Sequence, residues 1–313
     1  MNIFQTLNST LPVLLIIALG FFLNRRRLVK PETILDLKSL IVNVTLPLVL
    51  FRAFGTMVFE FRYLLIVAIV FFACTAVMLL TTSLKNLPGL RSRYAPFLMA
   101  GFEAGMLGYA VFSSIFGEAN VPVFAVIDLG QVVFVFFVLV TRLQAFEGQR
   151  QSWQATVGNF FRTPVIIAIL AGVIFNISGI YDILGNSVLG QTFLATLGIL
   201  AGLTTPLVAI VIGYGLNFKA GRVSAALQTV FLRLLVWVSL ALLINHFIIR
   251  QWFQLDRIFE AAVLLMFILP APFVIPLYSR SSDETDQDYI LNTLSIGTLA
   301  ALVGVIVIRL FYA

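Results

Sequence analysis

The sequence contains a single cysteine, Cys74, and a single histidine, His246, in 313 residues. Cys74 lies within an apolar run, so the chain has neither a disulfide framework nor a cysteine-rich metal site. His246 has no second histidine within helical reach, and we therefore expect no zinc site and no redox chemistry. The residues predict no cofactor of any kind.

Charge is also scarce, because only 11% of the residues are charged and 60% are hydrophobic, with a mean hydropathy of +1.04. A water-soluble domain of this length needs more polar surface, so the composition places the chain in lipid. The net charge is +6, but the basic residues form short clusters between apolar runs instead of a stripe on one face. We interpret the clusters as topology signals and expect no nucleic-acid partner.

Ten runs of mainly apolar residues are long enough to cross a bilayer as helices, which takes roughly 17 to 25 residues. We expect the first run to be a membrane span and not a cleaved signal peptide, because three arginines follow it where a small-residue cleavage site is needed. The sequence therefore predicts an all-α polytopic membrane protein with ten transmembrane helices. The spans are expected near residues 7–23, 34–57, 63–83, 94–116, 121–143, 163–179, 189–217, 224–249, 258–279 and 287–311.

The loop charges predict the orientation of these spans. Thirteen basic residues follow the odd-numbered spans and five lie on the opposite side, so the first set is predicted to be cytoplasmic. We expect a multi-pass protein of the cell (inner) membrane with both termini on the outer side. The predicted outer set is Arg52, Arg62, Arg250, Arg257 and Arg309; the cytoplasmic set is Arg25, Arg26, Arg27, Lys30, Lys85, Arg91, Arg93, Arg142, Arg150, Arg162, Lys219, Arg222 and Arg280.

The chain also repeats itself. Pro12, Gly20 and Asn24 have the same mutual spacing as a second proline, glycine and asparagine 152 residues later, namely Pro164, Gly172 and Asn176. Each copy carries five spans, and an odd number forces the second copy to enter the bilayer in the opposite orientation. Such inverted repeats are typical of secondary transporters. We predict a first five-helix repeat over 1–143, a cytoplasmic linker over 144–162 and an inverted second repeat over 163–313.

Later spans keep the same pairing with a slowly growing offset. Residues 45–49, TLPLV, match residues 204–208, TTPLV, at an offset of 159. Gly130 and Arg142 match Gly297 and Arg309 at an offset of 167. Any one match between leucine-rich helices is weak, whereas a monotonic series of proline and glycine matches indicates a true repeat.

Two matched spans contain the residues that interrupt helices. The fourth span carries GFEAGMLGY over 101–109, and the ninth carries LPAPFVIP over 269–276. Proline removes a backbone donor and glycine lowers helix propensity, so we predict that both helices are broken and cross at a substrate site. Ordinary kinks that permit tight packing are the alternative reading. The predicted substrate residues are Gly101, Gly105, Gly108, Pro270, Pro272 and Pro276.

The second span carries NVTLPLVLF over 43–51, which looks like the Asn-x-x-Leu-Pro signature of the auxin efflux carrier family, and GMLG over 105–108 resembles that family's glycine-rich turn. The chain resembles this family, which includes bacterial malate and malonate permeases, over nearly its whole length. The resemblance implies two inverted five-helix repeats and an elevator-like motion of helices 3–5 and 8–10 against helices 1, 2, 6 and 7, as a homodimer. Glu103 stands where many members have asparagine, which bears on the coupling ion.

Glu103 and Asp128 are the acids that lie well inside apolar runs. An ionised carboxylate at the centre of a membrane costs at least about 2.5 to 3.5 kcal/mol, so each is expected to be protonated, paired or facing water. We predict that Glu103 carries a proton, and that Asp128 with Gln131 assists it or binds a co-transported cation. A structural carboxyl that joins two helices is the alternative for both acids.

Several polar residues lie near the prolines of the scaffold. Asn43, Thr45, Pro47, Thr205 and Pro206 are predicted to face the substrate, although such side chains also cap carbonyls freed by prolines. Arg233 is a tempting anion ligand, but the sequence favours a snorkelling arginine at the membrane interface. His246 and the three tryptophans are best explained as interfacial or packing residues.

The favoured function is therefore a secondary carrier for a small organic anion such as a carboxylate, working by proton coupling or as a uniporter. A membrane enzyme would need a nucleophile with its base, paired carboxylates or a metal cluster, and we predict no catalytic residues. A sodium-coupled bile-acid-type symporter shares the five-helix plan, but the ninth span offers no Glu, Gln or Asn around its break. A channel or a substrate sensor on the same fold remains a further alternative.

Overall fold

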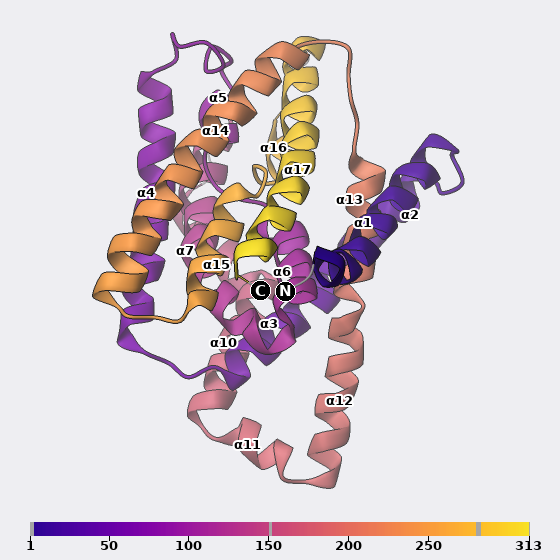
Figure 1. Ribbon diagram of the computed structural model, residues 1–313, viewed down its shortest axis with the longest axis vertical. Helices are drawn as coiled ribbons and strands as arrows, with labels where there is room; N and C mark the ends of the chain where they lie inside the picture. Colours follow the sequence, from indigo (N-terminus) through magenta and orange to yellow (C-terminus); the bar gives the residue numbers. More distant parts are fainter. Residues whose placement is uncertain (1–2, 150–151, 280–282, 313) are drawn as a thin grey trace. The chain divides into compact units, whose positions relative to one another are not determined.

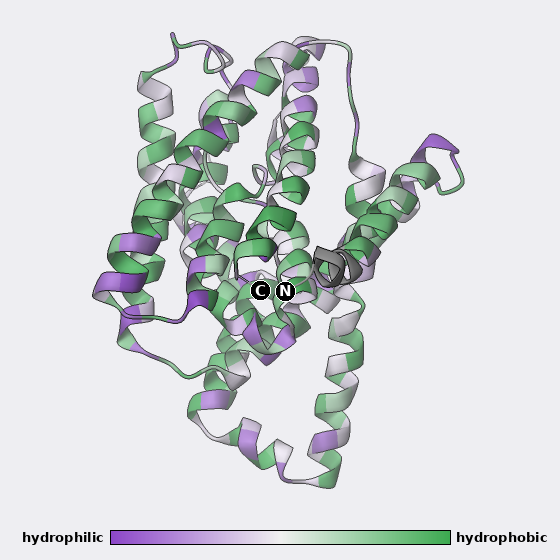
Figure 2. Ribbon diagram, in the orientation of Figure 1, coloured by the Kyte–Doolittle hydropathy of each residue, from purple (hydrophilic) through white to green (hydrophobic). Residues whose placement is uncertain are grey.

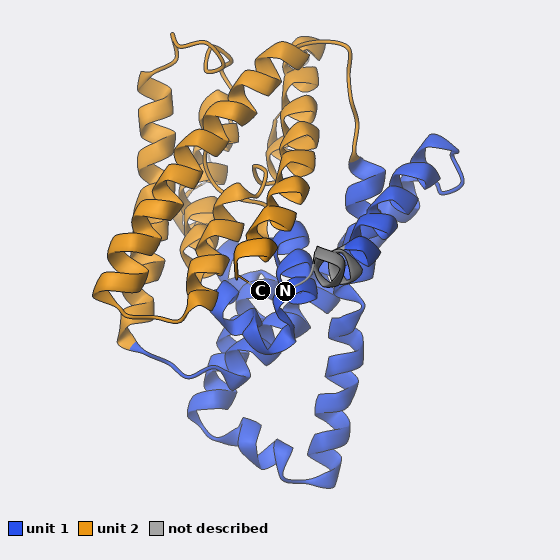
Figure 3. Cartoon of the chain, viewed as in Figure 1, with its two compact units in different colours: residues 1–60, 105–125, 158–215 blue, residues 61–104, 126–157, 216–313 orange. Residues whose placement is uncertain are grey.

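The computed structural model describes residues 3–149, 152–279 and 283–312, and within these ranges every regular element is a helix (Figure 1). Arg150 and Arg280 of the topology argument lie outside the described residues. The chain divides into two compact units (Figure 3). Unit 1 comprises residues 1–60, 105–125 and 158–215, and unit 2 comprises residues 61–104, 126–157 and 216–313.

Unit 1 contains the elements of predicted spans 1, 2, 6 and 7, together with the second part of span 4. Prolines open two of its helices at the first position, where their missing N–H costs nothing. The helices are α1 (Ile3–Arg25), α2 (Pro31–Leu40), α3 (Leu46–Thr56), α6 (Tyr109–Phe116), α10 (Pro164–Ile177), α11 (Ile180–Gly185), α12 (Val188–Gly202) and α13 (Thr204–Gly215), with the shorter turns η1 (Ile41–Thr45) and η3 (Glu118–Asn120).

Unit 2 contains predicted spans 3, 8, 9 and 10 and most of span 5. Its elements are α4 (Phe61–Ser83), α5 (Ala95–Met99), η4 (Val135–Val140), α8 (Thr141–Phe146), α14 (Val223–Leu243), η5 (Ile244–Trp252), α15 (Arg257–Ile268), α16 (Ile275–Tyr278) and α17 (Glu284–Tyr312). Three elements are shared by the two units along the chain, namely η2 (Ala104–Gly108), α7 (Val121–Phe134) and α9 (Trp153–Arg162).

The helices have the length and hydropathy of a multi-pass membrane protein. Among the described residues, seven are long and apolar enough to cross a bilayer, and the pair α9 and α10, bent by 62°, would make eight. Figure 2 shows hydrophobic residues along α4 and α14, with hydrophilic residues gathered at helix ends and connections. The first and ninth predicted spans correspond to a shorter apolar helix, Leu11–Arg25, and to the divided pair α15 and α16. Ten spans therefore stay a prediction.

In unit 1 the helices pair through glycines whose main chains touch. A β-carbon on Gly20 of α1 would collide with the carbonyl oxygen of Ile210 in α13, and one on Gly172 of α10 would lie 2.6 Å from the carbonyl oxygen of Phe51 in α3. Small residues at helix interfaces allow this close approach in membranes. Both contacts join residues at the offsets read from the sequence, because 20 and 172 differ by 152, and 51 and 210 by 159.

Asparagines at the ends of the same helices extend the pattern. The Asn24 side chain donates a hydrogen bond to the carbonyl oxygen of Tyr214 at 2.6 Å. The Asn176 side chain donates to the carbonyl oxygens of Phe54 and Met57 at 3.1 and 2.8 Å. Each amide thus satisfies carbonyls at the end of the partner helix, where no intrahelical donor remains.

The close packing of unit 1 predicts that alanine in place of glycine lowers stability at a helix contact but not at an open position. A β-carbon on Gly213 of α13 would overlap the carbonyl oxygen of Ile17, so Gly213→Ala should destabilise the protein by roughly 1 to 3 kcal/mol, the usual cost of overpacking. Gly202, the last residue of α12, has open space around it and serves as the control. Thermal unfolding in detergent should show a lower midpoint for Gly213→Ala and no loss for Gly202→Ala; equal midpoints would contradict the packing argument.

Candidate functional site

The fourth span is interrupted where the sequence predicts. Helix α5 ends at Met99, and residues 100–103 are non-helical before η2 begins. Ala100 is extended, with φ −112° and ψ 151°, and Gly101 has φ +71°, a conformation that residues with a β-carbon rarely adopt. The glycine is therefore required for the break itself.

The ninth span is interrupted over residues 269–274, between α15 and α16. Leu269 precedes Pro270, and a residue before proline is driven out of the helical region by contact with the ring. Leu269 accordingly has φ −60° and ψ 151°. The two predicted interruptions are thus confirmed, with Pro276 inside the short helix α16 that follows the second one.

The two breaks meet within unit 2, and we call residues 100–103 and 269–274 together the junction. The backbone N–H of Glu103 donates to the carbonyl oxygen of Pro270 at 2.9 Å. The backbone N–H of Phe273 donates to Oε2 of Glu103 at 2.5 Å. Glu103 is only 8% exposed, so its side chain and its main chain both join the two broken segments.

Close packing at the junction also uses the predicted glycine and proline. A β-carbon on Gly101 would lie 3.0 Å from Cγ of Pro272, and one on Gly297 of α17 would lie 3.3 Å from Cβ of Pro270. Gly101, Glu103, Pro270 and Pro272 are therefore brought together. Gly105 and Gly108 follow the first break and belong to unit 1.

Arg233 was wrongly predicted to be an interfacial residue. It is 2% exposed, and its guanidinium donates to the carbonyl oxygens of Leu98 at 2.9 Å, Gly101 at 2.5 Å and Leu269 at 3.1 Å. These carbonyls end α5 and α15, where the helix dipole is negative and intrahelical donors are missing. One cation thus satisfies freed carbonyls from both broken helices.

An aromatic cluster lies beside this guanidinium. The Phe102 ring lies 5.1 Å from the Arg233 guanidinium carbon and stacks on Phe267 with 5.1 Å between ring centroids. Trp237, one turn after Arg233 on α14, packs edge-on against both rings, and its indole N–H donates to the carbonyl oxygen of Met99 at 2.7 Å. Trp237 is thus a packing residue.

The second predicted acid forms its own pair. The Gln131 side-chain amide donates to Oδ1 of Asp128 at 3.1 Å, and both residues lie buried on one face of α7. The two residues are therefore joined by a hydrogen bond, and their role in coupling stays a prediction.

The predicted scaffold residues are divided by the fold. Asn43 is exposed and donates to the hydroxyl of Ser39 at 3.0 Å, while Thr45 and Pro47 are buried at the start of α3. Pro47 is accommodated because the π-helical turn η1 precedes it, which changes the backbone that its ring would otherwise strike. Pro206 lies in the first turn of α13. Thr205 alone of these five lines the cavity described next.

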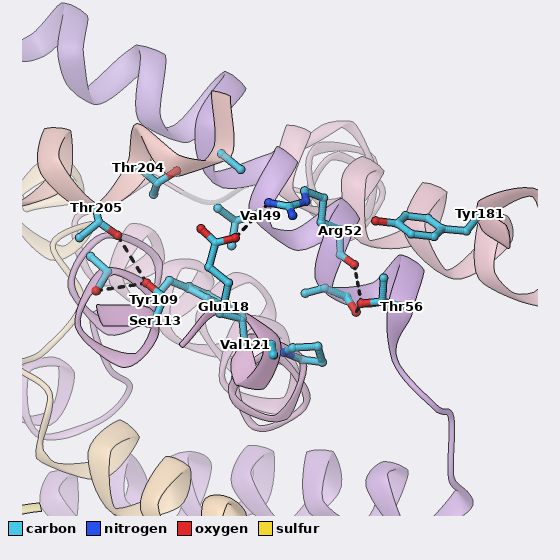
Figure 4. Close-up of a pocket in the computed structure, with 15 residues that line it drawn as sticks. Val49, Arg52, Thr56, Tyr109, Ser113, Glu118, Val121, Tyr181, Thr204 and Thr205 are labelled. Carbon is cyan, nitrogen blue, oxygen red and sulfur yellow. Dashed lines mark hydrogen bonds and ion pairs between the residues drawn. The ribbon is translucent and has the colours of Figure 1, made fainter. Parts of the chain in front are cut away.

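Unit 1 contains a cavity of about 310 Å³ whose polar lining the sequence did not reveal (Figure 4). Its one arginine and one carboxylate face each other: Arg52 on α3 and Glu118 at the start of η3 form an ion pair with 3.1 Å between Nη1 and Oε2. The sequence placed Arg52 among the outer topology charges, and no motif marks Glu118. The lining residues are Val49, Arg52, Ala53, Thr56, Tyr109, Ala110, Ser113, Glu118, Ala119, Val121, Pro122, Tyr181, Ala201, Thr204 and Thr205.

Comparison with known proteins gives the family. A family model described as "Membrane transport protein" matches residues 6–309. The chain belongs to this family of membrane transport proteins. A similar protein is an "Uncharacterized transporter" of Methanothermobacter thermautotrophicus, 24% identical over 306 residues that cover 95% of each chain. The family expected from the sequence is thereby confirmed, and the protein is a membrane transporter.

The role of Arg233 predicts a large effect from a neutral substitution. Arg233→Gln removes the cation and leaves buried carbonyls without donors, each of which costs about 1 to 3 kcal/mol. We expect a clearly lower unfolding midpoint in detergent and loss of transport. Arg25→Gln, at an exposed position at the end of α1, is the control and should leave both unchanged. A stable, active Arg233→Gln protein would contradict this role.

Proposed function

We propose that this transporter is a secondary carrier that moves a small organic anion, such as a carboxylate, across the cell membrane by proton coupling. The observation that carries the proposal is the junction, where a buried carboxyl, Glu103, accepts the N–H of Phe273 at the second broken helix. Membrane proteins tolerate broken helices only where protein or a watery cavity surrounds them, and secondary transporters commonly place their substrate site where such helices meet.

The inverted repeat is part of this proposal. It is supported by the contacts of unit 1, where Gly20 meets Ile210 and Gly172 meets Phe51 at the offsets of the repeat. An inverted repeat exchanges the partners of each helix pair in this way, since α1 packs on α13 as α10 packs on α3. We propose repeats over 1–143 and 163–313 joined by a linker over 144–162.

We propose an elevator-like motion in which unit 2 carries the substrate and unit 1 is the scaffold. The composition of the units supports this assignment, because unit 1 holds spans 1, 2, 6 and 7 and unit 2 holds spans 3, 8, 9 and 10. The resemblance implies the same division except for residues 105–125, which belong to unit 1. We also retain from the sequence the expectation of a homodimer with both termini outside.

Proton coupling is proposed for Glu103 because its carboxyl is buried and accepts a main-chain hydrogen bond. Binding and release of a proton would change that hydrogen bond and with it the contact between the two broken segments. Asp128, paired with Gln131, is proposed to assist. A sodium site is less well supported, because the side chains of residues 269–274 include no carboxylate or amide.

Uptake of labelled malate into proteoliposomes tests the function. A saturable flux that requires a pH gradient is expected, whereas flux proportional to concentration would indicate a channel. Glu103→Gln keeps an oxygen that accepts the Phe273 N–H but cannot exchange a proton, so its uptake should no longer depend on pH. Glu147→Gln, which alters another hydrogen-bonded carboxylate of unit 2, is the control. Unchanged pH dependence in Glu103→Gln would remove Glu103 from the coupling.

The proposed topology is tested by labelling. Cys74 is buried and is the one cysteine of the chain, so a Cys74→Ala background accepts single cysteines added at either end. A membrane-impermeant maleimide should label both ends in intact cells. Labelling of only one end without permeabilisation would contradict the ten-span inverted arrangement.

A further inference from the structure

The cavity of unit 1 contains one cation, Arg52, and only one of its side-chain nitrogens donates a hydrogen bond. The Arg52 side chain is 33% exposed, and it donates to Glu118 through Nη1 alone; no other acceptor contacts it among the residues from Leu11 onward whose side chains the structure describes. A guanidinium has five N–H donors in a planar fork that suits a carboxylate through two parallel hydrogen bonds. The site therefore has unused capacity for an anion.

The position of Arg52 is fixed by its neighbours. It lies on α3 with Val49, Ala53 and Thr56, which share one helical face toward the cavity. A β-carbon on Gly198 of α12 would lie 3.4 Å from the Arg52 guanidinium, an ordinary van der Waals distance, so α12 passes beside the guanidinium. The cation thus lies at the cavity wall between α3 and α12.

Glu118 is attached through a turn. Gly117 ends α6 with φ +83°, and the side chain of Asn120 donates to the carbonyl oxygen of Phe116 at 2.7 Å. The Glu118 side chain itself is 62% exposed, so it can turn away into solvent at little cost. The ion pair is of the exposed kind, which stabilises a protein weakly.

Hydroxyl-bearing side chains lie among the apolar residues that line the rest of the cavity. Ser113 on α6 and Thr205 on α13 lie 3.4 Å apart through their hydroxyl oxygens. Thr204 is 3% exposed, and its hydroxyl has no hydrogen-bond partner among the described residues. A buried hydroxyl without a partner is costly, and a polar ligand or water would satisfy it. The Tyr181 ring packs beside Phe51 and lines the same cavity.

We propose that this cavity binds a small organic acid, whose carboxylate takes the place of Glu118 on Arg52. The structure itself shows that a carboxylate reaches this guanidinium, since Glu118 occupies it. The nearby hydroxyls of Ser113, Thr204 and Thr205 supply partners for a second polar group of the acid. The site shares no residue with the junction, and the choice of an organic acid as probe rests on the proposed function.

Calorimetric titration of malate into the purified full-length protein in detergent tests the site. Glu118→Gln removes the competing carboxylate and should lower the malate Kd by about two- to fivefold, the range that corresponds to an exposed ion pair. Arg52→Gln should raise the Kd by roughly tenfold or more, because charge-assisted hydrogen bonds are lost. Arg257→Gln, which removes an exposed arginine of unit 2, should leave the Kd unchanged.

Three outcomes would overturn the inference: equal malate affinity in wild type and Arg52→Gln, weaker binding in Glu118→Gln, or inorganic phosphate that binds as well as malate with the same dependence on Arg52. If Arg52→Gln does not fold, Glu118→Gln decides alone, because loss of a merely structural ion pair would not tighten binding. If malate is taken up but its binding does not depend on Arg52, this site is refuted and the proposed transport is not. If malate binds through Arg52 but is not taken up, the proposed transport is refuted and this site is not.

Discussion

The junction depends on the hydrogen bonds that the Arg233 guanidinium donates to main-chain carbonyls. A helix that stops inside a bundle leaves carbonyl groups with no donor, and a buried carbonyl without a partner costs free energy. Unit 2 contains two such helix ends, and Arg233 satisfies Leu98, Gly101 and Leu269 together. Because one side chain serves both ends, it also fixes the distance between them. Glu103 completes the arrangement from the other direction by accepting the N–H of Phe273.

Arg233 and Glu103 thus contact opposite kinds of main-chain group in the broken segments. Arg233 contacts carbonyls at the carboxyl ends of α5 and α15, and the Glu103 carboxyl contacts the amide of Phe273 within the second break. This matches the polarity of the peptide dipole, which is negative where Arg233 binds. Phe102 lies beside the guanidinium and packs against Trp237 and Phe267, and the Trp237 indole N–H donates to the carbonyl oxygen of Met99. The junction is therefore held by main-chain hydrogen bonds that two ionisable residues organise.

The sequence predicted the two helix breaks, because they depend on the local backbone conformation. Gly101, Pro270 and Pro272 fix the breaks through their own allowed conformations, so their positions were readable without any knowledge of packing. The sequence predicted that Gly20 and Gly172 occupy equivalent positions, whereas the contacts of Gly20 with Ile210 and of Gly172 with Phe51 are seen only in the structure. Arg233 was misjudged because its ligands are carbonyls, which every residue carries and no sequence pattern marks. Arg52 and Glu118 were missed for a related reason, since loop charges serve orientation and pairing alike and 66 residues separate the two.

The pairing of α1 with α13 has a consequence for biosynthesis. Asn24 finds its partner carbonyl in Tyr214, 190 residues further along the chain. At about 5 to 20 residues per second, the ribosome needs on the order of 10 to 40 s to make that stretch. During this interval the surface of α1 around Gly20 contacts lipid or an insertion factor, because α13 has not yet been made. The helices of unit 1 can pack together only after α13 has been synthesised, so unit 1 assembles late in the synthesis of the chain.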